Sequence, residues 1–197
     1  MTARALAEAA VAARTCTACP LYEHATQTVF GEGPVSAALL LVGEQPGDRE
    51  DLAGEPFVGP AGGVLWKCLA EAGIDRGNVY VTNAVKHFKF NQRGKRRIHQ
   101  KPNTGEITAC HPWLDVELAN VSASVVVLLG ATAVRAVMGK DLPIGANRAQ
   151  PLPLDGGRTA VVTYHPSAVL RADDRAAEIR AALVDDLRLA ASLVATR

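Results

Sequence analysis

The segment from Ala37 to Gly47 constrains the fold more than any other part of the chain, because an uninterrupted apolar run ends there at the polar loop Gly43-Glu44-Gln45-Pro46-Gly47. A short run without polar alternation is typical of a parallel strand that is covered on both faces. Open α/β sheets bind their ligands beyond the carboxyl ends of such strands. The run therefore predicts either that Glu44 faces a ligand site or that it caps the next helix.

Three further apolar runs, at 79–83, 124–130 and 160–163, alternate with segments of helical pattern at 62–72, 106–120, 131–138 and 175–194. This alternation predicts an α/β fold with a central four-stranded parallel sheet flanked by helices on both sides.

Polar side chains follow three of the four predicted strands, namely Glu44, Asn83 and His165. Parallel strands bring their carboxyl ends to one sheet edge, so we expect these side chains to share one pocket. Phe57, in the loop 54–63, is either a core anchor or a stacking surface for a flat ligand beside that pocket.

The length of 197 residues suits a single domain, 1–197, with a substantial core. The content of 48% hydrophobic and 21% charged residues is ordinary for a globular protein, and no apolar run is long enough to span a bilayer. The Ala-rich segment 5–13 is interrupted by Glu8, which favours an amphipathic helix over a signal peptide. We expect a cytoplasmic monomer without a membrane anchor.

The segment 86–102 is strongly basic and contains no acidic residue. Its positive charges are Lys86, Lys89, Arg93, Lys95, Arg96, Arg97 and Lys101. A long polar loop of this kind predicts a polyanionic partner, most commonly nucleic acid, or else a merely solvated loop.

The motif Cys16-Thr17-Ala18-Cys19 has the spacing that places two thiolates on one metal ion or cluster. It precedes the first predicted strand, whereas a thioredoxin-like motif opens a helix after a strand. Of the other cysteines, Cys110 lies in the helix expected over 106–120 and Cys68 in the helix over 62–72.

These motifs resemble those of the iron–sulfur uracil-DNA glycosylases of family 4 and, within that superfamily, the UdgX type, which binds covalently to uracil-DNA. The matching segments are 43–47 (GEQPG), 81–86 (VTNAVK), Cys110 in its helix, and 165–171 (HPSAVLR). Gln45 departs from the GEAPG of ordinary family 4 members, as in the UdgX type, and the segment 95–99 (KRRIH) resembles the UdgX-specific insertion. The resemblance implies the uracil-DNA glycosylase fold.

The resemblance also implies a 4Fe-4S cluster on Cys16, Cys19 and Cys110. We expect His87 to be the fourth ligand, since it stands where family 4 places a cysteine, and Cys68 is the alternative. The same four residues also suit a structural zinc ion.

The resemblance further assigns roles at the expected pocket. It implies that His99 attacks C1′ of the deoxyribose, with Glu44, Gln45 and His165 as further catalytic residues. Phe57, Asn83 and His165 are expected to bind uracil, and Lys95, Arg96, Arg97, Ser167 and Arg171 to contact DNA. The expected partner is uracil-containing DNA, with single strands preferred. A turnover uracil-DNA glycosylase and a non-catalytic iron–sulfur DNA-binding module are the competing interpretations.

Overall fold

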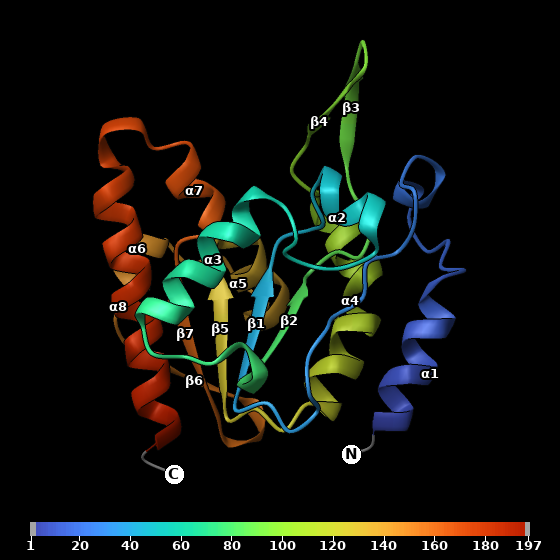
Figure 1. Cartoon of the computed structure of the whole chain (residues 1–197). Coiled ribbons are helices and arrows are strands. Elements are labelled where there is room, and N and C mark those ends of the chain that lie inside the picture. Colours follow the sequence, from blue (N-terminus) through green and yellow to red (C-terminus); the bar gives the residue numbers. More distant parts are fainter. Residues whose placement is uncertain (1–2, 196–197) are drawn as a thin grey trace.

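The computed structural model describes residues 3–195 and contains a five-stranded sheet between two layers of helices (Figure 1). The four predicted strands are present as β1 (Leu39–Gly43), β2 (Val79–Asn83), β5 (Val125–Leu129) and β7 (Arg158–Thr163). They run parallel, in the spatial order β2-β1-β5-β7. Every residue of β1, β2 and β5 is buried, which explains why these strands lack polar alternation.

The prediction of four parallel strands is wrong in one respect, because a fifth strand makes the sheet mixed. Strand β6 (Pro151–Leu154) pairs antiparallel with β7 at the edge of the sheet. It contains Pro151 and Pro153, which have no N–H to donate and are tolerated mainly on edge strands. The two prolines hid this strand from the sequence pattern.

The side chains of the central strands point alternately into two cores. On one face, Leu40 and Val42 pack with α4 (Thr104–Asn120) and α5 (Ala131–Met138). On the other face, Leu39 and Leu41 pack with α3 (Pro60–Glu71) and α8 (Ala176–Ala195). These helices match the predicted ones to within two residues at each end.

The remaining helices are short or peripheral. Helix α1 (Ala3–Ala13) packs on α4, and α2 (Asp48–Ala53), α6 (Ile144–Asn147) and α7 (Pro166–Leu170) lie in connections. Single 3-10 turns cover Pro20–Glu23, Arg76–Asn78, Asp155–Gly157 and Asp173–Arg175. In the described part of the chain, no helix combines the length and apolar character needed to cross a membrane.

The basic segment is a β-hairpin rather than the expected loop. Strands β3 (Phe90–Arg93) and β4 (Arg96–His99) pair antiparallel, and Gly94 adopts a left-handed φ of 57° at the turn. The hairpin rises from the end of the molecule toward which β1 and β2 point (Figure 1). Its strands carry mostly exposed polar residues, so no buried face marked them in the sequence.

The strand register brings the predicted polar residues to one level. Gly43 pairs with Asn83 across β1 and β2, and Leu129 pairs with Thr163 across β5 and β7. Glu44 directly follows β1 and His165 stands two residues after β7, so their side chains emerge at the same sheet edge as Asn83.

Candidate active site

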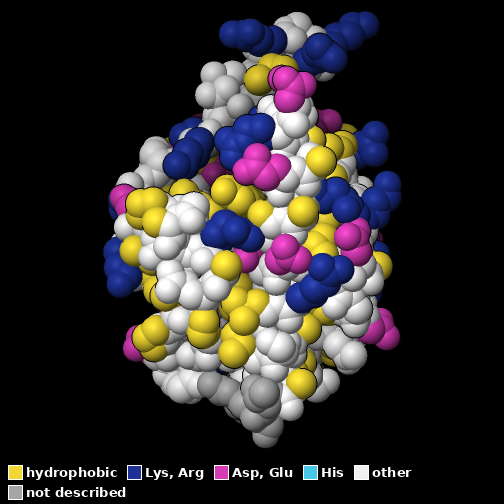
Figure 2. All heavy atoms as spheres, turned by 90° about the vertical axis from the view of Figure 1, so that its left-hand side faces the viewer, with side chains coloured by type: hydrophobic (Ala, Val, Ile, Leu, Met, Phe, Trp, Pro, Cys, Tyr) yellow, Lys and Arg dark blue, Asp and Glu magenta, His cyan; other side chains and the backbone are white. Residues whose placement is uncertain are grey.

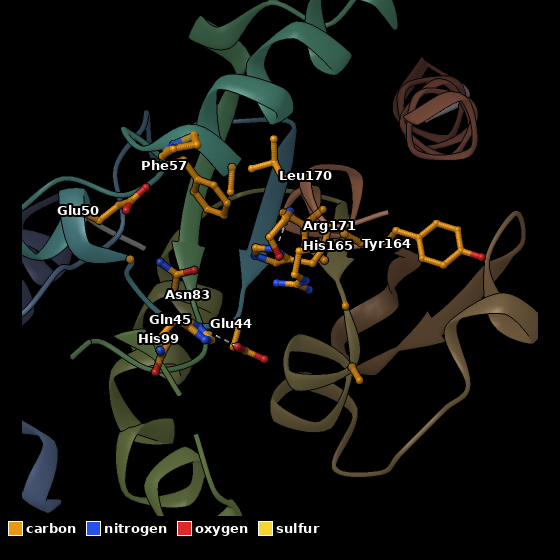
Figure 3. Close-up of a pocket in the computed structure, with 18 of the residues that line it drawn as sticks. Glu44, Gln45, Glu50, Phe57, Asn83, His99, Tyr164, His165, Leu170 and Arg171 are labelled. Atoms are coloured by element: carbon orange, nitrogen blue, oxygen red, sulfur yellow. Dashed lines mark hydrogen bonds and ion pairs between the residues drawn. The ribbon is translucent and has the colours of Figure 1, made fainter. Parts of the chain in front are cut away.

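A cavity of about 610 Å³ opens at the carboxyl edge of the sheet (Figure 3). Its walls bring together the predicted residues Glu44, Gln45, Phe57, Asn83, His99, His165, Ser167 and Arg171. Small-molecule sites in proteins have volumes of roughly 300–1,000 Å³, so this cavity has the size of a ligand-binding site.

Gly43 allows Asn83 and Phe57 to lie directly against the strand. A Cβ atom at this position would meet Asn83 Oδ1 at 2.4 Å and Phe57 Cζ at 2.8 Å. We attribute the glycine to this close approach of two protein side chains. Any larger residue would push the amide and the ring out of place.

Phe57 has a strained backbone at the wall of the cavity. Its φ is 56°, a left-handed value that is rare for an aromatic residue, and its carbonyl accepts a hydrogen bond of 3.0 Å from Trp66 Nε1. The ring is 5% exposed and lies 6.4 Å from the His165 ring, centroid to centroid. Residues held in such conformations cluster at functional sites.

The two carboxylate oxygens of Glu44 have different partners. Oε1 lies 3.2 Å from His99 Nε2, and Oε2 accepts a hydrogen bond from the Thr132 hydroxyl. Burial raises the pKa of Glu44, but the hydrogen bonds from His99 and Thr132 outweigh burial and hold the pKa below its usual value. Helix α2 has Gly47 as its N-cap, so Glu44 faces the cavity and does not cap the helix.

His165 presents a neutral ring with a defined tautomer. Burial lowers its pKa to about 4. The Ser167 backbone N–H donates to His165 Nδ1 at 3.1 Å, so Nδ1 is an acceptor and the ring proton resides on Nε2. The Ser167 hydroxyl also lies 2.8 Å from Nδ1.

Gln45 clamps the base of the hairpin. Its Nε2 donates to the carbonyls of Lys89 and Gln100, each at 3.1 Å, and its Oε1 accepts from Lys89 N at 3.2 Å. These bonds reach both ends of the hairpin. The amide thereby fixes where β4 delivers His99.

Arg97 is turned into the protein. Its guanidinium donates to Asp48 Oδ1 and to the fully buried Asp51 Oδ2, both at 2.5 Å, and to Thr26 Oγ1 at 3.2 Å. It also lies 5.4 Å from the Phe88 ring centroid. This arrangement differs from the expected phosphate contact: Arg97 ties the hairpin to α2.

The other positive charges of the basic segment differ in burial, and the half-buried Lys89 donates to Glu106 Oε2 at 2.9 Å. Arg93, Lys95 and Arg96 are exposed, and Figure 2 shows Lys and Arg side chains crowning the projecting end of the molecule. Lys86 is instead completely buried and pairs with Glu117 across 2.5 Å, while its Nζ donates to the Asn83 carbonyl at 2.8 Å. The expectation that Lys86 belongs to a polyanion-binding loop is therefore wrong.

Three of the predicted metal ligands, Cys16, Cys19 and Cys110, are near one another as free thiols on one face of the sheet. Cys16 Sγ accepts from Trp113 Nε1 at 3.2 Å, and Cys110 Sγ accepts from the Lys86 backbone N–H at 3.1 Å. Donors of this kind suit thiolate ligands. Within residues 3–195, no three His, Cys, Asp or Glu side chains form a set that could hold a single metal ion.

The two candidates for a fourth ligand differ in position. Cys68 packs in the core on the other face of the sheet, with Leu65 and Leu187. His87 is 5% exposed and directly follows Lys86 in the chain. The backbone N–H of Lys86 donates a hydrogen bond to Cys110 Sγ, so His87 lies next to a residue that contacts this cysteine. Burial lowers the pKa of His87, which favours the neutral imidazole that metals require.

Thr132, which donates to Glu44, was not predicted from the sequence, and neither were Arg49, Glu50 and Tyr164 in the cavity wall. Thr132 follows β5, the only predicted strand end to which no polar residue was assigned, and its side chain stands three residues beyond Leu129. Gly130, with a φ of 85°, turns the chain between them. A search one turn beyond each strand would have found it.

Comparison with known proteins places these features in a family. The sequence profile of the uracil DNA glycosylase superfamily matches residues 30–188. A type-4 uracil-DNA glycosylase of Thermotoga maritima is 38% identical over 182 residues, which cover 92% of this chain and 90% of that protein. A type-4 uracil-DNA glycosylase of Pyrobaculum aerophilum is 36% identical, covering 80% and 81%, and a type-5 uracil-DNA glycosylase of Thermus thermophilus is 32% identical, covering 71% and 68%.

Proposed function

The chain belongs to the uracil-DNA glycosylase superfamily, and we propose that this uracil-DNA glycosylase excises uracil and then bonds, through His99, to C1′ of the remaining deoxyribose. The observation that carries the proposal is the position of the His99 ring, whose Nε2 lies 3.2 Å from Glu44 Oε1 at the cavity. At that distance no water fits between the two groups. The imidazole occupies the place beside the carboxylate where an attacking water would stand.

Uracil enters the cavity after flipping out of the strand. Its ring stacks on Phe57, and the Asn83 amide donates to O4, where cytosine carries an amine instead. His165 Nε2–H donates to O2, because the Ser167 N–H occupies Nδ1. The His165 donor is fixed before the base arrives, and a donor placed in advance stabilises negative charge on the departing uracil.

The bond between C1′ and N1 of uracil breaks with its electron pair going to uracil. A ring nitrogen of neutral His99 then gives its lone pair to C1′. The resulting imidazolium loses its N–H proton, for which Glu44 is the base beside the ring. The product is a neutral N-alkylated imidazole, and it has no good leaving group for hydrolysis.

Glu44 serves this reaction as an anion. With its pKa below the usual value, the carboxylate is ionised near neutral pH and stabilises positive charge on the sugar. Its contact with His99 also orients the ring before the sugar cation forms.

A 4Fe-4S cluster held by Cys16, Cys19, Cys110 and His87 completes the proposal. Such a cluster takes one ligand at each iron, so it suits ligands spread more widely than those around a single ion. When bound, the cluster supplies a structural cross-link that joins the N-terminal segment to α4 and to the segment after β2, with no redox step. Cys68, on the opposite face, has no part in it.

The substrate is uracil-containing DNA, preferably single-stranded, and the protein acts as a monomer. Exposed Lys95 and Arg96 at the hairpin tip and exposed Arg171 at the cavity suit phosphate contacts. The 610 Å³ cavity holds one flipped nucleotide, and a single strand flips a base without breaking a base pair.

A turnover glycosylase is the second candidate, because the type-4 relative from Thermotoga maritima matches 92% of the chain. In that case the hairpin only clamps DNA and water takes the sugar cation. The two candidates share uracil recognition and differ in the fate of C1′.

The test is to incubate the protein with a labelled single-stranded oligonucleotide containing one uracil and to separate the products on a denaturing gel. We expect a band resistant to heat and SDS that His99→Ser abolishes and His24→Ser, a change at an exposed histidine outside the cavity, preserves. An alkali-cleavable abasic product without that band would establish turnover. A His99→Ser protein that still cross-links would refute the assignment of the nucleophile.

A further inference from the structure

The Glu44 carboxylate is held on both sides by groups from different parts of the chain. His99, on the hairpin, contacts Oε1, and Thr132, on α5, donates to Oε2. An ionised carboxylate can only accept hydrogen bonds, so the Thr132 hydroxyl must be the donor of this one. Hydrogen bonds to charged groups are about twice as strong as neutral ones.

The fold fixes Thr132 more firmly than the hairpin fixes His99. Thr132 is 2% exposed in the first turn of α5, whereas the His99 side chain is 46% exposed. Gly130, at φ 85°, makes the turn from β5 into α5, and a Cβ there would lie 3.1 Å from the His165 Cβ. One glycine therefore permits both the approach of Thr132 to Glu44 and the packing of His165.

We infer that Thr132 is a positioning residue that locks the Glu44 carboxylate by one oxygen, so that the other oxygen faces His99 and the sugar. This inference rests on the function proposed above. A glutamate has three side-chain torsions, and a bond to a rigid helix removes most of that freedom before substrate binds.

The charges around Glu44 define what removal of the hydroxyl would do. The groups that face Glu44 are His99 from β4, His165 from the segment after β7, and the Thr132 hydroxyl from α5; Arg171 faces His165. Burial alone raises the pKa of Glu44. Loss of the hydroxyl leaves this burial less opposed, so the pKa of Glu44 rises and the carboxylate is neutralised at a higher pH.

The variants are Thr132→Val, which removes the hydroxyl at nearly constant volume, and Thr132→Ser, which retains it. Thr163→Val is the matched control, because Thr163 is also fully buried and donates to a carboxylate, Asp186, at 2.6 Å. Each variant is assayed for single-turnover uracil release and for cross-linking across the acid pH range.

We expect the acid limb of both rates to move upward by about one pH unit in Thr132→Val, which gives about tenfold slower reaction on that limb. Thr132→Ser should restore the wild-type limb, and Thr163→Val should leave the limb in place even where it lowers stability. An unmoved limb in Thr132→Val, or an equal movement in Thr163→Val, overturns the inference.

A direct titration keeps this test separate from the proposed function. NMR of the side-chain carboxyl carbons in isotope-labelled protein, with Glu44→Gln for assignment, reports the pKa of Glu44 without any substrate. A higher pKa in Thr132→Val supports the inference even where the protein proves to be a turnover enzyme. An unchanged pKa refutes it even where covalent capture is established.

Discussion

Replacing Arg97 with Met should uncouple covalent capture from uracil excision. The substitution keeps an apolar stem beside Phe88 and removes the guanidinium that joins β4 to α2. The two proposed uracil contacts, Phe57 and Asn83, lie outside the hairpin. The variant therefore separates the delivery of His99 from the binding of the base.

The magnitude follows from the partners of Arg97. Its bond to Asp51, which is fully buried, contributes about 1.5–3 kcal/mol as a charge-assisted hydrogen bond. The pair with Asp48, whose side chain is 51% exposed, adds about 0.5 kcal/mol. A loss of about 2–3.5 kcal/mol lowers the ratio of docked to undocked hairpin by roughly 30-fold to 400-fold. Because Gln45 still holds the base of the hairpin, we expect cross-linking to slow by about tenfold to a hundredfold.

The assay follows free uracil and cross-linked protein in the same single-turnover reaction. Uracil release should fall by less than about threefold, and Arg97→Lys, which keeps the charge without the forked geometry, should be intermediate. Arg93→Met, the same change at an exposed hairpin position, is the control. Cross-linking by Arg97→Met within about twofold of the wild type, or a parallel loss of uracil release, would refute the reasoning.

Three further predictions test the substrate site, the DNA contacts and the cluster. Asn83→Asp, which replaces an amide donor with an acceptor, should lower the preference for uracil over cytosine in competition assays, and unchanged preference would contradict the role of Asn83. Replacing Lys95 and Arg96 with Ala should reduce the slope of log affinity against log salt by about 0.7 for each lost phosphate contact with single-stranded DNA, and a constant slope would place the DNA elsewhere. Purified protein should contain iron and acid-labile sulfide, with about four irons per chain. The Cys110→Ala variant should lose both, whereas the Cys68→Ala variant should retain them. Bound zinc without iron would refute the cluster.

The sequence was most informative where packing alone decides the structure. The run ending at Gly43 and the runs at 79–83, 124–130 and 160–163 are buried on both faces, so their apolar composition identified the parallel strands and the polar side chains beyond them. Strand β6 was not predicted because it contains two prolines, which are tolerated in a sheet mainly on edge strands.

Hydrogen bonds and ion pairs between segments far apart in the chain could not be predicted from sequence patterns. The basic segment looked uniformly charged, yet Lys86 is buried on Glu117, Arg97 pairs with Asp51, and Lys95 is exposed. The positions of the Lys86 and Arg97 side chains depend on acidic partners that lie 31 and 46 residues away along the chain. The contact between Thr132 and Glu44 spans 88 residues and has no local signature.

The measurement that tests the central claim most directly is mass spectrometry of the protein after reaction with a uracil-containing oligonucleotide and digestion with nuclease and protease. The account predicts that the peptide containing His99 carries the added deoxyribose and that fragmentation places the addition on the imidazole ring. An adduct on any other residue, or intact protein without an adduct beside free uracil and abasic DNA, would contradict it.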